Sequence, residues 1–381
     1  MKLKFVFLLI MGLSFLNAKP VDKSITLGIF YPWSTNKSKL ESTNFNLSLF
    51  QNSVGNVEGA SISGFSAICN GSVNGIQASL LYSQINKDLQ GISFSTVNVV
   101  NQSILGVQAG IAFNLLGKSF SGYQVVGAMN FVGGYFRGMQ QSAVFNIVGR
   151  DFYGLQSAVV GNVVGGGFKG AQFGTTFNFV ARKMSGLQTA SLNVCAELKG
   201  VQLGIGNITQ LNRGWQIGLM NLAEQQEGVP IGLINISDDG NIRWQNYISN
   251  FAGFVTAIRF ESNNFVSSLE IGAPNLESEI EESVLFGFHY GYRVPWKRLG
   301  FETDFGFFHV IYEPDNEESD IPNSFALQLR FSCSLRITEN VSIFGGIGGS
   351  TMADYPDLDD EDAETVTSED RLLYFCGINL F

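Results

Sequence analysis

A glycine recurs at nearly constant spacing from residue 59 to residue 228. The successive spacings are 16, 16, 15, 16, 16, 16, 16, 16, 14, 14 and 14 residues. A fixed period of this length indicates an array in which each copy is one small structural unit that buries its apolar surface against its neighbours. The anchors are Gly59, Gly75, Gly91, Gly106, Gly122, Gly138, Gly154, Gly170, Gly186, Gly200, Gly214 and Gly228.

Two amide side chains accompany the glycine in most copies. Glutamine follows two positions after the glycine, and asparagine follows eight positions after it, or seven in the later copies. Neither amide is a strong acid, base or nucleophile, so the pattern indicates structure rather than catalysis. The glutamines are Gln77, Gln108, Gln124, Gln140, Gln156, Gln172, Gln188, Gln202 and Gln216; the asparagines are Asn114, Asn130, Asn146, Asn162, Asn178, Asn193, Asn207, Asn221 and Asn235.

Each copy has the alternation of a β-strand. In residues 122–132, Tyr123, Val125, Met129 and Phe131 share one parity, whereas the glycine, glutamine and asparagine share the other. This period of two, with β-branched and aromatic residues, favours strand over helix. The charged residues of these copies fall between the alternating segments. Each 16-residue unit is therefore predicted to hold about 11 residues of strand and about five of turn.

The units at residues 200–207 (GVQLGIGN) and 214–221 (GWQIGLMN) carry a family resemblance. They resemble the GxQxGxxN repeats of the secreted surface repeat-containing proteins of spirochaetes and other Gram-negative-type bacteria. The resemblance covers residues 25–240, although most copies here are 16 residues long and the family form has 14. It implies a location in the cell envelope and supplies no catalytic motif.

After residue 241 the repeat stops and the alternation becomes longer. Fourteen residues alternate without a break at 324–337, more than the common strand length in soluble proteins and enough for a tilted membrane-spanning strand. Further strands are predicted at 251–261, 265–273, 283–295, 299–313, 341–352 and 371–381.

The connections between these strands alternate in length. Short turns occur at 262–264, 296–298 and 339–340, whereas the longer connections at 274–282, 314–323 and 353–370 are rich in Asp and Glu. Short turns on one side and long polar loops on the other are typical of outer-membrane barrels. If the long loops are external, the strand at 371–381 ends in the periplasm, and its aromatic Phe381 partly resembles the assembly signal of such barrels.

The first residues and the composition point to the envelope as well. Lys2 and Lys4 precede an apolar run that ends near Ala18, which predicts a secretory signal peptide over residues 1–18. Charged residues make up 15% of the chain, below the roughly 25% of soluble domains. The net charge of −10 argues against nucleic acid as a partner, since phosphate binding needs a basic surface. Outer-membrane lipid is the partner that we expect; any host or envelope partner stays unknown.

No residue set predicts a catalytic, cofactor-binding or metal site. His289 could act as the base of a hydrolase, but no serine motif accompanies it, and His309 shares a parity with aromatic residues. The acidic run 357–362 lacks the glycine and glutamate of a calcium loop, and the four glycines within residues 345–349 fit a crowded strand better than a nucleotide loop. The widely spaced cysteines Cys69, Cys195, Cys333 and Cys376 predict free thiols, with one disulfide as the alternative.

Six charged residues share the predicted lumenal parity. They could bias the passage of a solute, but we expect them to pair with one another instead. They are Arg259, Arg293, Glu302, Asp304, Arg330 and Arg336.

These patterns predict an all-β fold: an outer-membrane-type antiparallel β-barrel of about 22 strands, built from the 14–16-residue repeats, with the amide parity facing the lumen. The alternative is a β-solenoid of the repeats plus a C-terminal β-sheet or barrel. Stacked coils would explain why the amides are identical from copy to copy, because identical side chains form ladders. Against the solenoid, eleven residues of unbroken alternation leave little room for corners.

The predicted organisation has four parts: a signal peptide at 1–18, N-terminal strands at 19–58, the strand-repeat region at 59–240, and long alternating strands with acidic loops at 241–381. The predicted function is that of a non-enzymatic outer-membrane or cell-surface repeat protein, an integral barrel with a structural or pore-like role. The alternative function is a surface-displayed β-solenoid acting in adhesion or scaffolding.

Overall fold

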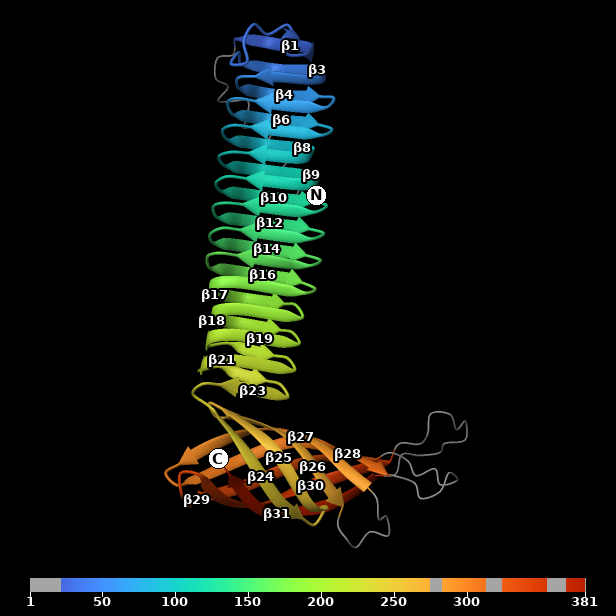
Figure 1. The fold of residues 1–381 in the computed structure, drawn as a ribbon, viewed down its shortest axis with the longest axis vertical. Helices are drawn as coiled ribbons and strands as arrows, with labels where there is room; N and C mark the ends of the chain where they lie inside the picture. The colour runs from blue at the N-terminus through green and yellow to red at the C-terminus, as the bar shows by residue number, and fades with distance from the viewer. Residues whose placement is uncertain (1–21, 275–282, 313–323, 355–367, 381) are drawn as a thin grey trace, which may run out of the picture. The chain divides into compact units, whose positions relative to one another are not determined.

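The computed structural model describes residues 22–274, 283–312, 324–354 and 368–380. Every regular element in these ranges is a strand, and the chain divides into two compact units, residues 1–203 and 204–381. Figure 1 shows stacked coils, coloured blue to green in the first unit, and a closed ring of strands coloured from gold to red. The predicted signal peptide and much of the acidic connections lie outside the described residues.

Unit 1 is a parallel β-solenoid, in which each coil of the chain lies on the one before it. Its strands are β1 (Lys23–Phe30), β2 (Trp33–Ser34), β3 (Thr43–Val54), β4 (Val57–Ser63), β5 (Ser66–Cys69), β6 (Val73–Ser79), β7 (Tyr82–Ile85), β8 (Leu89–Val100), β9 (Ile104–Leu116), β10 (Phe120–Val126), β11 (Met129–Val132), β12 (Phe136–Ser142), β13 (Phe145–Val148), β14 (Phe152–Ala158), β15 (Gly161–Val164), β16 (Phe168–Gly174), β17 (Phe177–Thr189) and β18 (Leu192–Leu203).

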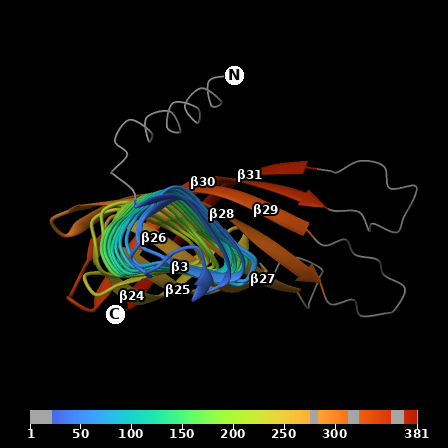
Figure 2. The same cartoon turned by 90° about the horizontal axis from the view of Figure 1, so that it is seen from above.

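The repeat period sets the register of this solenoid. In the 16-residue copies each residue pairs with the residue one period further along the chain, so Gly138 meets Gly154 and Gln140 meets Gln156. On the other side of the coil, Asn146 meets Asn162. Figure 2, seen along the stack, shows the coils of unit 1 lying behind one another. A coil typically consists of one seven-residue strand and one four-residue strand, as β12 and β13 illustrate.

The inside of each coil has an apolar half. Phe120, Phe136, Phe152 and Phe168 stack as a ladder, with ring centroids 4.8 to 4.9 Å apart and planes within 4° of parallel. Each of these rings is at most 2% exposed, and valines such as Val148 face them from the four-residue strands. The centroid spacing equals the distance between hydrogen-bonded strands, so the stacking follows directly from the register.

The other half of the coil interior is polar and consists of two amide ladders. Gln140 Nε2 donates to Gln124 Oε1 at 2.8 Å, while Asn130 Nδ2 donates to Asn146 Oδ1 at 2.8 Å. The two ladders therefore run in opposite directions along the stack. Asn130 Nδ2 also donates to the carbonyl of Gln141 at 2.7 Å, next to the corner of the following coil. The amides are buried, and the ladders give most of them a hydrogen-bond partner in a neighbouring coil; Gln108, the first glutamine of the continuous ladder, keeps a buried Nε2 without one.

The repeated glycine is required by the backbone. Gly154 has φ +134°, and a Cβ atom there would lie 1.9 Å from the carbonyl oxygen of Gly138 in the preceding coil. An L-amino acid therefore meets both backbone strain and a clash with an atom that cannot rotate away. Each copy begins with this glycine, and at this position the glycine lets successive coils approach closely.

The repeat continues into unit 2 with a shorter period. Asn207 Nδ2 donates to Asn221 Oδ1 at 2.9 Å, and Asn221 Nδ2 donates to Asn235 Oδ1 at 2.8 Å, in coils of 14 residues. The strands of these coils are β19 (Gly206–Asn212), β20 (Trp215–Ile217), β21 (Met220–Gln226), β22 (Val229–Ile231) and β23 (Ile234–Ser237).

The all-β fold is confirmed, and the repeats adopt the solenoid alternative rather than antiparallel barrel strands. Their amides point into the coil, not into a lumen. The predicted 11 strand residues per copy are present, but as seven plus four: β10 ends at Val126 and β11 begins at Met129. The corner was missed because this two-residue break preserves the alternation of buried and exposed side chains.

The C-terminal strands form a closed antiparallel barrel of eight strands, in place of the 22 that we expected for the whole chain. The predicted strands of this region are present within a few residues, and β24 was missed. The strands are β24 (Asn241–Ser249), β25 (Ala252–Ser262), β26 (Phe265–Pro274), β27 (Ser283–Trp296), β28 (Leu299–Tyr312), β29 (Ser324–Arg336), β30 (Val341–Asp354) and β31 (Ser368–Leu380).

The antiparallel register gives the barrel two different ends. Asn241 pairs with Glu261 beside the turn at 263–264, and Leu380 pairs with both Trp244 and Val341. The start of β24, the end of β31 and the short turns that follow β25, β27 and β29 therefore share one end, the short-turn end. The opposite, long-loop end holds the connections 275–282, 313–323 and 355–367 and the two-residue turn at 250–251.

We predict that Gly154→Ala disrupts the solenoid around its coil, whereas Gly167→Ala is tolerated. A Cβ at Gly167 has no neighbour closer than 3.5 Å, and this position carries no positive φ. Native-state hydrogen exchange of both variants measures the effect. We expect loss of protection in residues 136–174 for Gly154→Ala alone. Equal protection in the two variants would contradict the structural role of the repeated glycine.

Candidate functional site: the charged interior of the barrel

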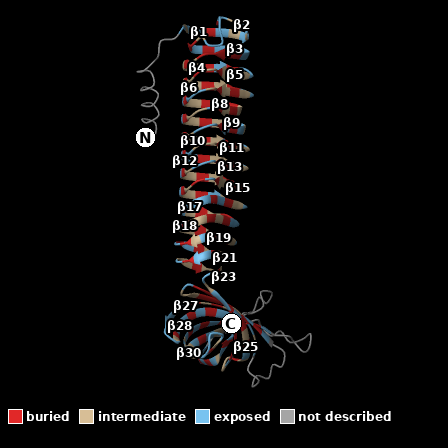
Figure 3. Ribbon diagram, turned by 60° about the vertical axis from the view of Figure 1, so that its left-hand side comes forward, coloured by how far each residue is buried: buried red, intermediate tan, exposed pale blue. Residues whose placement is uncertain are grey.

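The barrel wall separates apolar and charged side chains by parity. Outward positions carry large apolar residues, whereas inward positions carry the charged ones; among the described outward positions of β24–β31, Asp370 is the only Asp, Glu, Lys or Arg. The exposed apolar side chains are Ile242, Trp244, Ile248, Phe254, Ile258, Ile271, Val284, Phe286, Tyr292, Val294, Trp296, Phe301, Phe305, Phe307, Ile311, Leu327, Leu329, Phe331, Leu335, Ile343, Ile347, Leu372, Tyr374, Ile378 and Leu380. Figure 3 shows the alternation of buried and exposed residues along these strands.

The centre of the barrel interior is built around Arg330 of β29. Its guanidinium contacts Asp304 Oδ1 at 2.6 Å and Glu270 Oε1 at 3.1 Å, and it donates to Tyr247 Oη at 2.9 Å. Glu270 also accepts from Tyr247 Oη at 2.5 Å and lies 3.2 Å from His289 Nδ1. All five side chains are buried. The cluster joins five strands that are not all neighbours in the ring.

A second charged cluster lies toward the short-turn end. The Glu261 carboxylate forms ion pairs with three arginines, with N–O distances of 2.9 Å to Arg243, 2.9 Å to Arg259 and 2.8 Å to Arg293. Arg259 also pairs with Glu302 through two hydrogen bonds. No side chain of this cluster is more than 14% exposed. The two clusters together contain four arginines and four carboxylates, so the interior charges balance.

Toward the long-loop end the interior is apolar. This part of the interior is a cluster of buried residues packed with Phe251 and Met352, and Tyr247 links it to the central charged cluster. A barrel of eight strands is just wide enough to be filled by side chains. The interior is therefore a packed core with ion pairs rather than an open channel. The cluster consists of Tyr247, Ala252, Val255, Leu285, Phe308, Val310, Ala326, Phe344, Leu373 and Phe375.

The predicted pairing of the lumenal charges with one another is confirmed for four of the six residues, while Arg293 pairs with a carboxylate outside the predicted set. Arg259 pairs with Glu302, Asp304 pairs with Arg330, and Arg293 pairs with Glu261. Arg336 instead lies exposed at the end of β29. Paired charges in a packed interior leave no row of side chains along which a solute could pass.

The two histidines lie on opposite faces of the wall. His289 points inward, is 2% exposed and meets the edge of the Phe308 ring at 5.3 Å. His309 points outward and stacks on Phe325, with centroids 4.4 Å apart and planes 5° from parallel. The two imidazoles therefore share no site.

The sequence analysis missed four members of the interior network: Arg243, Tyr247, Glu261 and Glu270. Arg259 and Glu261 share a parity in a predicted strand, so parity alone could have identified Glu261. Arg243 and Tyr247 were missed with their strand, β24. Their partners on distant strands could not be inferred from alternation, because alternation does not show which strands face one another across the closed barrel.

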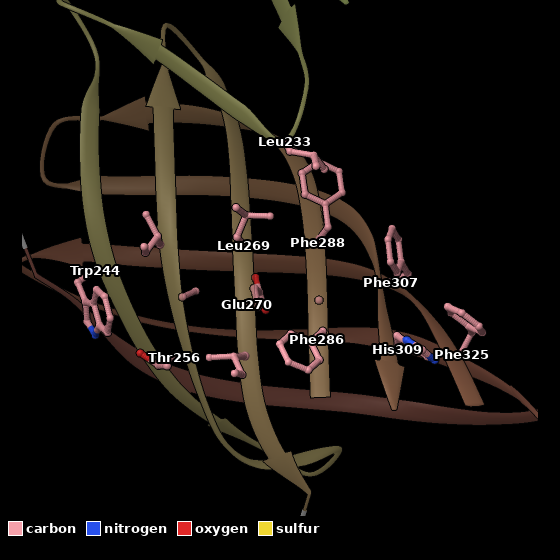
Figure 4. Close-up of a pocket in the computed structure, with 14 residues that line it drawn as sticks. Leu233, Trp244, Thr256, Leu269, Glu270, Phe286, Phe288, Phe307, His309 and Phe325 are labelled. Atoms are coloured by element: carbon pink, nitrogen blue, oxygen red, sulfur yellow. The ribbon is translucent and has the colours of Figure 1, made fainter. Parts of the chain in front are cut away.

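The outer wall carries an apolar groove of about 610 Å³. Its lining includes Trp244, Phe286, Phe288, Phe307, His309 and Phe325, all at outward positions. Figure 4 shows these rings along several neighbouring strands. Apart from the imidazole of His309, these six side chains offer an apolar surface.

The remaining candidates have structural explanations or lie outside the described residues. Glycines 345–349 belong to β30, and a Cβ at Gly346 would lie 2.4 Å from the Phe375 ring. The acidic run 357–362 falls outside the described ranges. Within those ranges, no three His, Cys, Asp or Glu residues gather to hold a metal ion, and the four cysteines are free.

Comparison of the chain with protein-family models, curated proteins and solved structures finds no match. The resemblance to surface repeat-containing proteins therefore stays a prediction. In the described part of the chain no helix has the length and apolar character to span a membrane.

We predict that Arg330→Met destabilises the barrel by about 3–5 kcal/mol, because it leaves Glu270 and Asp304 buried without their cation. Arg336→Gln at the exposed end of the same strand should change stability by less than about 0.5 kcal/mol. Urea unfolding followed by tryptophan fluorescence compares the two. Neutralising the acids as well, in Arg330→Met with Glu270→Gln and Asp304→Asn, should recover much of the loss. Equal stability of the two single variants would contradict the role of the cluster.

Proposed function

We propose that the barrel is an integral anchor in the outer membrane and that the chain is a non-enzymatic structural repeat protein, whose solenoid the barrel holds at the membrane. The observation that carries the proposal is the inverted wall of the barrel, with apolar side chains outside and paired charges inside. In water such a wall would expose a far larger apolar surface than the few hundred Å² usual for soluble proteins.

The physical chemistry of a bilayer accounts for the same features. A closed barrel satisfies its backbone hydrogen bonds without water, which lipid requires. The barrel strands have 9 to 14 residues, and about 9–11 tilted residues span the hydrocarbon layer. An arginine facing mid-depth lipid would cost about 2–4 kcal/mol, and the four arginines of the network face the interior instead. Because that interior is filled, the proposed role is an anchor rather than a pore.

The four native cysteines provide a test of this proposal. Cys333 and Cys376 are exposed on the outer wall, whereas Cys69 and Cys195 are buried in the solenoid. Burial raises the pKa of Cys69 to about 12, so its reactive thiolate is scarce at neutral pH.

In a membrane fraction we predict that a lipid-soluble thiol reagent modifies Cys333 and Cys376, while a charged maleimide modifies none of the four. Mass spectrometry of peptides locates the adducts. A cysteine introduced at Tyr135, 53% exposed in unit 1, gives the reaction rate of an aqueous site. Modification of Cys333 and Cys376 by the charged maleimide at that rate would refute membrane insertion.

The connectivity also suggests which side the solenoid occupies. Only residues 238–240 separate β23 from β24, and β24 starts at the short-turn end. The filled interior offers no passage for the chain to the long-loop end. If long loops face the exterior, as they do in outer-membrane barrels, the solenoid lies in the periplasm. This differs from the surface display expected for an adhesin.

We predict that, in intact cells of a Gram-negative host, an impermeant maleimide labels Asp370→Cys at the long-loop end but not Tyr135→Cys in the solenoid. Both variants carry Cys333→Ala and Cys376→Ala. Permeabilising the outer membrane should expose Tyr135→Cys to the reagent. Labelling of Tyr135→Cys before permeabilisation would place the solenoid on the surface and favour adhesion instead.

A further inference from the structure

One side of the solenoid in unit 1 is a continuous apolar surface, which we call the apolar face. It is formed by the outward residues of the shorter segment in seven successive coils, and the register places each residue next to its equivalent. All are half-buried or exposed, as Phe113 at 39% and Phe131 at 42% illustrate. The residues are Val97, Val99, Phe113, Leu115, Met129, Phe131, Phe145, Ile147, Val163, Phe177, Phe179, Leu192 and Val194.

The outward positions of the opposite strands in the same coils are mixed. Exposed apolar residues such as Leu105 and Phe173 lie there together with polar ones, which include Arg137, Gln141, Ser157 and Lys169. The apolar face is therefore not a general property of the repeat. Side chains at outward positions can vary without affecting the coil interior. The apolar face carries an apolar side chain at thirteen of its fourteen sites, with Gly161 as the exception, and this calls for an explanation in terms of what covers the face.

A basic ridge runs along the edge of the apolar face. In alternate coils a cation follows the last apolar residue by three positions: Lys118 after Leu115, Arg150 after Ile147, and Arg182 after Phe179. Backbone hydrogen bonds stack these corners, since Arg150 N donates to Gly134 O and Gly134 N donates to Lys118 O. All three cations of the ridge, Lys118, Arg150 and Arg182, are exposed.

The local charge contrasts with that of the whole chain. Residues 89–200 contain seven cations and two acids, Asp151 and Glu197, so this stretch carries a net charge of +5 while the full chain has −10. Besides the three cations of the ridge, these are Arg137, Lys169, Lys183 and Lys199. Glu197 pairs with Lys183 at 2.8 Å. An apolar surface bordered by excess cations is the combination that binds the interface of an anionic bilayer, where apolar side chains enter the acyl boundary and cations meet the headgroups.

We propose that the apolar face docks onto a phospholipid bilayer surface with anionic headgroups, so that the solenoid lies along a membrane. Charge disfavours a second copy as the occupant, because a second copy brings the same cations to the basic ridge and leaves it without an anionic counterpart.

The test places one fluorophore at a time on the full-length chain in proteoliposomes. Phe113→Cys reports on the apolar face, and Met139→Cys, 38% exposed against 39% for Phe113, reports on the opposite strand. Both variants carry Cys333→Ala and Cys376→Ala. Liposomes of phosphatidylcholine are compared with liposomes that also contain phosphatidylglycerol, using nitroxide lipids and aqueous iodide as quenchers.

With phosphatidylglycerol we expect nitroxide lipids to quench the label at Phe113 and iodide to quench the label at Met139. Replacing Lys118, Arg150 and Arg182 together by Gln should weaken docking about 100-fold, because each cation contributes about fivefold at an anionic surface. The charge-conserving set Lys118→Arg, Arg150→Lys and Arg182→Lys should retain docking. Raising the salt concentration should weaken it as well.

Two results would overturn the inference. Equal iodide quenching at Phe113 and Met139 in anionic liposomes shows that the face stays in water. Protection of Phe113 from both quenchers, with energy transfer between labelled copies, shows that a second copy covers it. The inference rests on the proposed anchor only because the anchor brings the solenoid to a membrane. Insertion of the barrel is measured separately, by the thiol modification of Cys333 and Cys376 in the chain that keeps these cysteines. If the barrel stays out of the bilayer, adding anionic vesicles to the same labelled chains still tests the face.

Discussion

In-register parallel stacking is the constraint on which the solenoid depends. Once each coil lies on the one before it, every side chain faces its own copy about 4.8 Å away. Only side chains that attract themselves at that distance can fill the interior. Phenyl rings stack, and an amide can donate to one copy while it accepts from the next, as Asn130 does with Asn114 and Asn146. A carboxylate or an ammonium group at those sites would repel its copy in every coil.

The barrel is governed by a different constraint, which is closure. A closed ring leaves no strand edge unpaired, and its inward face becomes a small volume that must be filled. Arg330 and Glu261 fill it by joining strands from different parts of the ring. The four arginines and four carboxylates balance, so the charges are kept from the outer wall at little electrostatic cost beyond their desolvation.

Much of the fold follows from the sequence, and the missing part has a definite cause. Alternation identified seven of the eight barrel strands and the inward parity of Arg259, Glu302 and Arg330. It did not separate antiparallel barrel strands from stacked coils, because both require a period of two. The corner between β10 and β11 keeps that period, so it left no mark in the alternation. The identity of Gln and Asn from copy to copy was the feature that distinguished the two arrangements.

The sequence by itself determined the repeat, its period and the strand character of the repeats and of seven barrel strands. Glycine, glutamine and asparagine recur at fixed offsets, so each can pair with its own copy. Charged residues occur at one parity or in the connections, and this distribution shows which side of a strand is buried. Only the tertiary structure decided that the coils are parallel, that eight strands close into a ring and that Glu270 meets Arg330 and His289. Those contacts join residues far apart along the chain, and local alternation carries no information about which distant strand becomes a neighbour.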